Sequence, residues 1–105
     1  MSNAPEALNP EDAKLVTLAR ATRARTRAAE GAAVRDLDGR TYAAATVALE
    51  SLQITAVGVA VAMAISSGAR GLEAVVLLTD GELGQGDRAA VMEFGGAGVP
   101  ILVNP

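Results

Sequence analysis

The sequence contains no cysteine and no histidine. Without a thiolate or an imidazole, the chain cannot carry a cysteine or Ser-His-Asp nucleophile, ligate haem or an iron-sulfur cluster, or build an ordinary zinc site. Aromatic side chains are also scarce, since one Tyr, one Phe and no Trp contribute to a hydrophobic content of 50%. We therefore expect a core built from Ala, Val, Leu, Ile and Met.

The sequence has no strong excess of charge of one sign: twelve acidic residues slightly outnumber nine basic ones, and the formal charge is -3. This balance argues against a general nucleic-acid-binding protein. The basic residues are concentrated before residue 41, and four of them form a cluster of Arg20, Arg23, Arg25 and Arg27. A solvated helix face is the favoured interpretation. The alternative is an accessory surface on which Arg20, Arg23 and Arg27 bind RNA or another partner.

The sequence contains no candidate for a targeting segment or a membrane-spanning segment. Residues 1–10 lack the basic start and apolar run of a secretory signal. The most apolar stretch, residues 54–65, is shorter than the roughly 20 residues that span a bilayer. We therefore expect a cytoplasmic protein without a membrane partner. With 105 residues it should form one domain over 1–105, of which residues 1–10 are predicted to be a flexible tail.

The first helix is predicted to begin at Pro10, because Asn9 is a good cap, proline suits the first helical position, and two acids follow. It should run to about Ala29. Its predicted buried face has helical spacing and comprises Leu15, Leu18, Ala19 and Thr22.

A hairpin is predicted next, with strands at residues 32–35 and 40–45. The turn between them, residues 36–39, ends in an Asp-Gly pair that supplies the positive φ of a tight turn. Residues 46–50 are interpreted as a connection, and Tyr42 as a packing residue. Asp36 and Asp38 could be offered as an acid-base pair, but we expect water to solvate both in the turn.

The second half alternates helices and strands. Residues 51–67 are apolar almost all round and alternate like a strand in part, but their length and alanine content favour a helix that ends at Gly68. Such a helix needs apolar partners on several sides, which indicates subunit packing. Residues 73–79 read as a central strand, 88–94 as a short helix capped by Asp87, and 99–103 as a last strand.

These elements define an α/β fold in the order α-β-β-α-β-α-β. Helices that separate the later strands imply parallel crossovers, whereas the hairpin is antiparallel. We therefore expect a three-layer arrangement, with a mixed sheet and helices on both of its faces.

The loop Asp80 to Asp87 is rich in Gly and acid, and follows a strand. Its order matches neither the phosphate-binding loop nor the dinucleotide fingerprint, and an acid at the helix start would repel an anion. Asp80, Glu82 and Asp87 could ligate a divalent cation, but the EF-hand pattern fails, and Thr79 to Glu82 matches only one element of the von Willebrand A site. A plain loop with a helix cap is the favoured interpretation.

Four segments together carry a family resemblance. They are Gly31-Ala32-Ala33-Val34, Asp38-Gly39-Arg40-Thr41-Tyr42, the helix to Ser66-Ser67-Gly68, and Arg88 through Glu93. In this order they resemble the small homotetrameric cytidine deaminases, from the first helix to Val103. The resemblance implies the cytidine deaminase fold, zinc as the cofactor, and hydrolysis of cytidine to uridine.

The resemblance also shows which functional residues of that family are replaced. The Cys of its Cys-Ala-Glu motif falls on Val57, and the two Cys of its Pro-Cys-x-x-Cys motif fall on Gly84 and Asp87. The Glu that moves protons beside the zinc-bound water falls on Val59. The positions that hold the nucleoside fall on Ala28, Thr46 and Ala48.

We therefore expect no catalytic, cofactor-binding or metal-binding residue in this chain, and no zinc. The predicted function is a cytidine deaminase-like scaffold or binding module without catalysis, present as a homodimer or homotetramer, with an unidentified protein or small-molecule partner. The alternatives are a nucleoside deaminase and the RNA-binding accessory described above.

Overall fold

The computed structural model describes residues 8–105. Its main sheet has four strands in the order β2-β1-β5-β6. They are β1 (Gly31–Asp36), β2 (Thr41–Ala45), β5 (Leu72–Leu78) and β6 (Ile101–Asn104). β1 is antiparallel to β2 and β5, whereas β5 and β6 are parallel, so the sheet is mixed as predicted.

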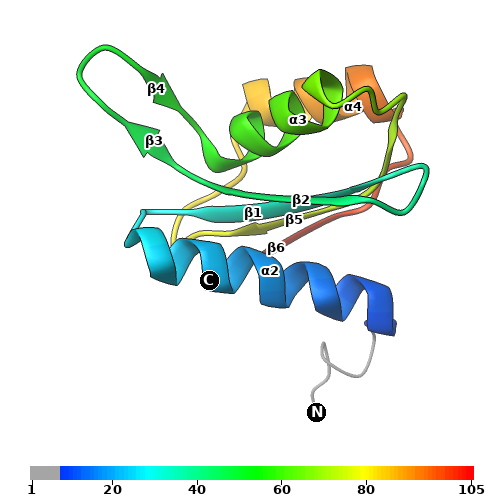
Figure 1. The fold of residues 1–105 in the computed structure, drawn as a ribbon, viewed down its shortest axis with the longest axis horizontal. Coiled ribbons are helices and arrows are strands. Elements are labelled where there is room, and N and C mark those ends of the chain that lie inside the picture. The colour runs from blue at the N-terminus through cyan, green and yellow to red at the C-terminus, as the bar shows by residue number, and fades with distance from the viewer. Residues whose placement is uncertain (1–7) are drawn as a thin grey trace.

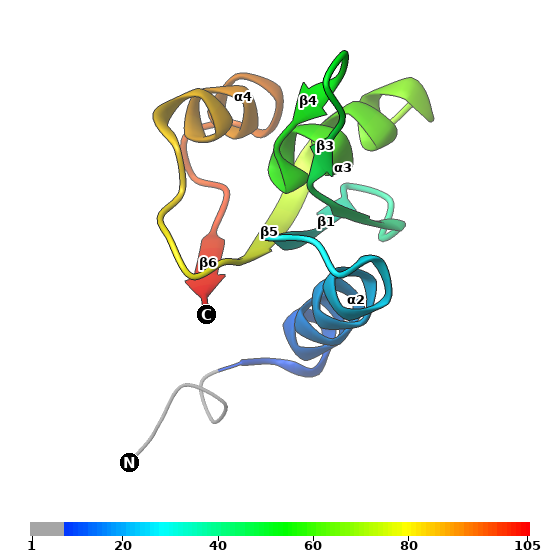
Figure 2. The same ribbon diagram turned by 90° about the vertical axis from the view of Figure 1, so that its left-hand side faces the viewer.

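Helices cover both faces of this sheet (Figures 1 and 2). α2 (Pro10–Thr26) lies on one face, and α3 (Ala56–Ser66) and α4 (Gln85–Gly95) lie on the other. Alternate residues of each strand therefore enter two separate cores: Val34, Val75 and Leu77 face α3 and α4, and Ala33, Val76 and Leu78 face α2. The three-layer fold predicted from the sequence is confirmed.

α2 begins as the sequence indicates, because the Asn9 side chain accepts a hydrogen bond of 2.8 Å from the Asp12 backbone N–H. It ends at Thr26 rather than near Ala29, since Arg27 takes a left-handed conformation with φ 55°. The predicted buried face is wrong at Leu18, which is 37% exposed. Val16 takes its place beside Leu15, Ala19 and Thr22.

A buried arginine ties the first turn of α2 to the sheet. Arg35 on β1 donates to Asp12 on α2 at 3.0 Å and to Glu73 on β5. Burial disfavours the charged guanidinium, but the hydrogen bonds to Glu73 and Asp12 outweigh it and raise the pKa of Arg35 above its ordinary value.

A second, two-stranded sheet was not predicted. β3 (Val47–Ala48) and β4 (Gln53–Ile54) pair antiparallel across a two-residue turn. The sequence had indicated a connection over residues 46–50 and the beginning of a helix from residue 51. They precede α3, which therefore begins at Ala56 rather than at residue 51. It ends before Gly68, as expected, where φ is 95°.

The last elements shift by a few residues from their predicted bounds. α4 begins at Gln85 with Gly84 as its cap, so Asp87 lies inside the first turn and is not the cap. β5 and β6 run one or two residues away from the predicted strands. Among the described residues, no helix is long and apolar enough to cross a membrane. The tail predicted at residues 1–10 lies largely outside the described residues.

Candidate functional site

One end of the main sheet gathers the positions that the sequence singled out. Gly31 pairs with both Ala45 and Leu78, so β1 starts where β2 and β5 end. The first residues of α3 and α4 lie at this same end (Figure 1). Ligand sites of open α/β sheets commonly form at such an edge. The positions found there or in the adjoining segments are Ala28, Thr46, Ala48, Val57, Val59, Gly84 and Asp87.

A hydrogen bond joins the first turns of α3 and α4. The Thr55 hydroxyl donates to Asp87 Oδ1 at 2.7 Å, and Thr55 Oγ1 accepts from the Gly58 backbone N–H at 3.0 Å. Thr55 is thus the cap of α3 and its link to α4. An acid in the first turn of α4 is also stabilised by the helix dipole.

The other positions that the resemblance aligns with the metal site are apolar or lack a side chain. Val57 is completely buried in the core between α3 and the sheet. Val59 is half-buried, and Gly84 contributes only backbone. Among the positions that the resemblance aligns with the zinc ligands, Asp87 alone carries a side chain that can ligate a metal, and its carboxylate already accepts a hydrogen bond from Thr55.

This donor set does not fit zinc, which takes three or four nitrogen, sulfur or oxygen ligands in proteins. Among residues 8–105, no three His, Cys, Asp or Glu side chains come together as a group that could hold a metal ion. Asp80, one of the acids considered for a divalent cation, instead lies 3.5 Å from the Arg23 guanidinium.

The positions aligned with nucleoside-binding residues carry little polar chemistry. Thr46 bonds to Glu30, because its hydroxyl accepts from the Glu30 N–H at 3.0 Å and its own N–H donates to the Glu30 carbonyl at 3.2 Å. Ala28 is half-buried beyond the end of α2, and Ala48 is exposed on β3. These three side chains offer no carboxylate or carboxamide to a ribose.

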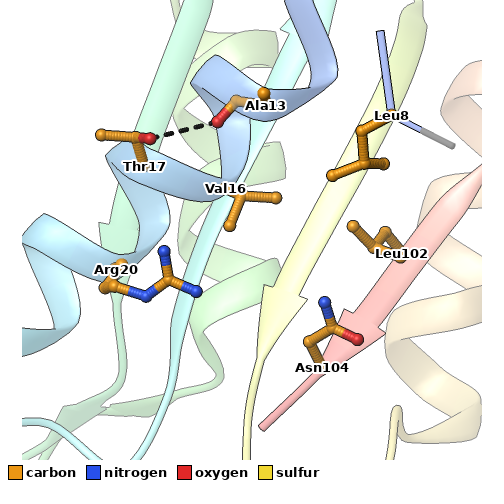
Figure 3. Close-up of a pocket in the computed structure, with 7 residues that line it drawn as sticks. All are labelled: Leu8, Ala13, Val16, Thr17, Arg20, Leu102 and Asn104. Carbon is orange, nitrogen blue, oxygen red and sulfur yellow. Dashed lines mark hydrogen bonds between the residues drawn. The ribbon is translucent and has the colours of Figure 1, made fainter. Parts of the chain in front are cut away.

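The three arginines proposed as a partner surface have different surroundings. Arg23 binds Asp80 and its side chain is only 23% exposed, whereas Arg27 is exposed at the end of α2. Arg20 lines a groove of about 320 Å³ between α2 and β6 (Figure 3). The groove has an apolar lining with polar groups from Thr17, Arg20 and Asn104; its other lining residues are Leu8, Ala13, Val16 and Leu102.

The hairpin carboxylates differ from what the sequence indicated, because Asp36 is buried and Asp38 is exposed. Tyr42 donates to Asp36 Oδ2 at 2.8 Å, and the backbone N–H groups of Asp38 and Arg40 donate to Oδ1 at 2.9 Å. Burial alone would raise the pKa of Asp36, but these hydrogen bonds outweigh it and lower the pKa below its ordinary value. The prediction that water solvates both carboxylates is therefore wrong for Asp36.

Tyr42 is more than a packing residue. Its hydrogen bond to Asp36, and then its burial, raise the pKa of the Tyr42 hydroxyl. The Asp36–Tyr42 pair lies at the hairpin turn, at the opposite end of β1 from the α3–α4 junction. It therefore stabilises the fold away from the site.

Sequence reasoning missed Thr55, whose side chain defines the α3–α4 junction. A threonine just before a run of helix-forming residues is a common cap signal, so the start of α3 was readable. The contact with Asp87 was not, because 32 positions separate the two residues.

Comparisons with known proteins agree with the observed fold. The family model described as cytidine deaminase-like matches residues 8–105. Among solved structures, the cytidine deaminase from Mycobacterium tuberculosis is 23% identical with a TM-score of 0.75, over 92% of this chain and 86% of that one. The cytidine deaminase from Mycobacterium leprae is 21% identical with a TM-score of 0.75, over 90% and 89%.

A third similar structure is the cytidine deaminase from Burkholderia pseudomallei, with 22% identity and a TM-score of 0.73, over 85% of this chain and 80% of that one. At these identities the likeness establishes the fold. Among curated proteins, none matches the chain significantly.

Proposed function

We propose that this chain, which belongs to the cytidine deaminase-like family, is a member without catalytic activity. It acts as a homo-oligomeric scaffold or binding module. The observation that carries this proposal is the α3–α4 junction. Where the resemblance places the three zinc ligands, the chain has a buried valine, a glycine, and an aspartate that accepts a hydrogen bond from Thr55.

The chemistry of hydrolytic deamination explains why this junction matters. Water must become a nucleophile at neutral pH, and bound zinc achieves this by lowering the pKa of water to about 7. Asp87 is the one metal-binding side chain among the three aligned positions, and a single carboxylate is too few for zinc.

Proton transfer meets the same obstacle. A general acid-base needs a titratable group within hydrogen-bond reach of the reacting atoms. The position aligned with the proton-shuttling Glu is Val59, which has no such group. Both parts of the reaction therefore lack their side chains at these positions.

The scaffold part of the proposal is supported by the surface of α3. This helix carries no charged residue, and Met63 and Ile65 are 40% and 50% exposed. Met63 lines a groove beside Ile54, and Ile65 lines another groove beside α4. Large apolar side chains exposed along an uncharged helix favour an interaction surface. A second copy of the chain would cover them.

The competing function is a nucleoside deaminase, favoured by the similar structures, which are themselves cytidine deaminases. The loss of cytidine absorbance on conversion to uridine separates the two. The assay uses the purified chain at high concentration with added zinc, and the Mycobacterium tuberculosis cytidine deaminase as the positive control. We expect turnover by the control and none by this chain.

Turnover that persists after re-purification would contradict the proposal. It would mean that the residues aligned with the zinc site are wrongly placed, or that this chain deaminates cytidine without the metal.

A further inference from the structure

The two faces of the main sheet are covered unequally. On one face, α3 packs against β1 and β2, and α4 packs against β5. On the other face, α2 is the only helix within residues 8–105, and it packs against β2, β1 and β5 (Figure 2). α2 therefore leaves the edge strand β6 largely uncovered on this face.

The side chains of β6 alternate between the two faces of the sheet. Ile101 and Val103 pack against the core on the side of α3 and α4, whereas Leu102 packs against the core on the side of α2. Leu102 and Asn104 both remain half-exposed. They form one wall of the groove of about 320 Å³, and α2 forms the opposite wall (Figure 3).

The width of the uncovered strip matches one helix. Adjacent strands lie about 4.8 Å apart, so β6, which is two strands away from β1, lies roughly 10 Å from it. α2 is centred over β1, because it packs against the strands on both sides of β1. The axes of packed helices lie about 8–10 Å apart. A second helix over β6 would therefore lie at packing distance from α2.

α2 presents a suitable flank to such a helix. Ala13, Thr17 and Arg20 line the groove, are exposed, and are spaced by four and three residues. This spacing places them in one row along α2, as at the contact positions of packed helices. The row begins with two small side chains, so a neighbouring helix can approach α2 closely there.

The charge of the groove is positive. Arg20 extends into the groove from α2 (Figure 3), and within residues 8–105 it forms no ion pair. The lining residues include no acid. Arginine binds carboxylates through charge-assisted and often bidentate hydrogen bonds. The complement of this groove is therefore an apolar stripe that covers Val16 and Leu102, with an acidic side chain beside it.

We propose that the groove binds an amphipathic helix of another protein, which lies alongside α2 and over β6. Its apolar stripe covers Val16 and Leu102, and an acidic residue on its flank binds Arg20. In this mode of recognition, side chains spaced by three and four residues along a helix fill an apolar groove. The inference rests on the binding-module part of the proposed function and names the class of partner.

The first test blocks the groove. The probe is a fluorescein-labelled synthetic helix of about 14 residues, with leucine along one face and glutamate on both flanks. Fluorescence anisotropy with the whole chain should give a micromolar dissociation constant. Ala13→Trp fills the groove and should raise this constant about thirtyfold. Ala21→Trp is the matched control, because Ala21 is exposed on α2 but does not line the groove, and it should leave the constant unchanged. Circular dichroism checks that both variants fold.

The second test exchanges the charges. Arg20→Glu places like charges together and should weaken binding of the probe about tenfold. A probe with lysine in place of glutamate should bind Arg20→Glu more tightly than it binds the wild type. Arg25→Glu is the control, because Arg25 is exposed on α2 outside the groove, and it should reverse neither preference.

The remaining outcomes contradict the inference. Absence of binding up to about 1 mM probe would overturn it. Binding that neither Ala13→Trp nor Arg20→Glu weakens would place the probe elsewhere on the chain and overturn it as well. If sedimentation equilibrium shows that Ala13→Trp separates copies of the chain, the groove is occupied by a second copy and not by another protein. The proposed lack of catalysis is decided separately, by the cytidine assay.

Discussion

Asp36 keeps its charge inside the sheet because three donors surround its carboxylate. The Tyr42 hydroxyl and two backbone N–H groups of the hairpin turn replace the water that burial removes. The folded state therefore binds a proton on Asp36 less readily than the unfolded chain does. Its contribution to stability is complete above the unfolded-state pKa of about 4, and is lost as the pH falls from there through the lower folded-state pKa.

Removal of the Tyr42 hydroxyl should reduce this contribution. Tyr42→Phe raises the folded-state pKa of Asp36 towards its unfolded value, so we expect lower stability at neutral pH and an acid-unfolding midpoint at higher pH. Circular dichroism across an acid titration measures both. The difference between variant and wild type should shrink as the pH falls through the lowered folded-state pKa of the wild type, because Asp36 is then protonated in both. Coincident acid-unfolding curves would contradict this account of Asp36.

Gly31 allows α2 to approach the sheet closely. A Cβ atom at this position would lie 2.3 Å from the Ala19 carbonyl oxygen and 2.7 Å from Arg23 Cβ. Neither distance is compatible with normal packing, and one of the two atoms is backbone. The glycine is therefore required by the contact between α2 and β1, not by a turn.

Gly31→Ala should push α2 away from β1 and lower the free energy of unfolding by about 1–3 kcal/mol, as overpacked cores do. Gly86→Ala is the matched control, because nothing lies within 4 Å of its added Cβ in the first turn of α4. Alanine there should leave stability unchanged or raise it by up to about 1 kcal/mol. Urea unfolding measures both. Equal effects of the two substitutions would exclude close packing as the reason for Gly31.

At the scale of the elements, the junction of α3 and α4 is held by side chains from both helices. Thr55 caps α3 and donates to Asp87, so a single hydroxyl serves two helices. The same two helix starts are where the resemblance places the ligands of a metal. In this chain a hydrogen bond connects them.

A double-mutant cycle measures that connection. Thr55→Val removes the cap and the donor and should cost about 1 kcal/mol or more, as loss of a helix cap does. Asp87→Ala removes the acceptor. If the hydrogen bond couples the helices, the double variant should be more stable than additivity predicts, by about 0.5–1.5 kcal/mol. Strict additivity would mean that α3 and α4 are held together by their apolar contacts alone.

The sequence predicted those helices and strands that carry a local signal, such as a helix cap, a turn glycine or a continuous apolar run. Asn9 and Pro10 fixed the start of α2, Gly68 marked the end of α3, and Gly39 has the positive φ of 85° that its turn requires. β5 was readable as a central strand because its apolar run is buried on both faces. Each of these elements carries its own cap, turn or hydrophobic pattern.

Elements that depend on distant partners were missed or misplaced. The β3–β4 hairpin has two pairing residues on each strand and a Glu-Ser turn, which lacks the Asn-Gly or Asp-Gly signal of a tight hairpin. Val16 is buried in place of Leu18, because the buried side of α2 depends on how the helix packs against the sheet. Asp36 was assigned to water because its acceptor role depends on Tyr42, six positions away.

At the scale of the whole molecule, the family resemblance is confirmed: the family model spans residues 8–105, and the neighbours share the fold. The positions of the candidate site follow from that resemblance, and the structure places them at or beside one end of the sheet. The bond between Thr55 and Asp87 could not be predicted, because a fold in three dimensions brings them together. The proposed lack of catalysis depends on the side chains at the positions aligned with the zinc site, because the fold itself is shared with the similar structures.

Self-association should be visible in thermal unfolding. If copies bind through α3, dissociation accompanies unfolding, and the melting temperature rises with protein concentration by mass action. Met63→Lys should remove most of this dependence, and Leu18→Lys should keep it. Differential scanning calorimetry over a hundredfold range of concentration provides the comparison. A wild-type melting temperature independent of concentration would contradict self-association.

Native mass spectrometry of the purified chain, after exposure to zinc and removal of the excess, tests the central claim most directly. It reports the number of copies and any bound metal in one spectrum. Our account predicts a small integer multiple of the 10.6 kDa chain mass, with no stoichiometric zinc. One zinc ion per chain would contradict the account of the α3–α4 junction, and a monomer alone would contradict the scaffold.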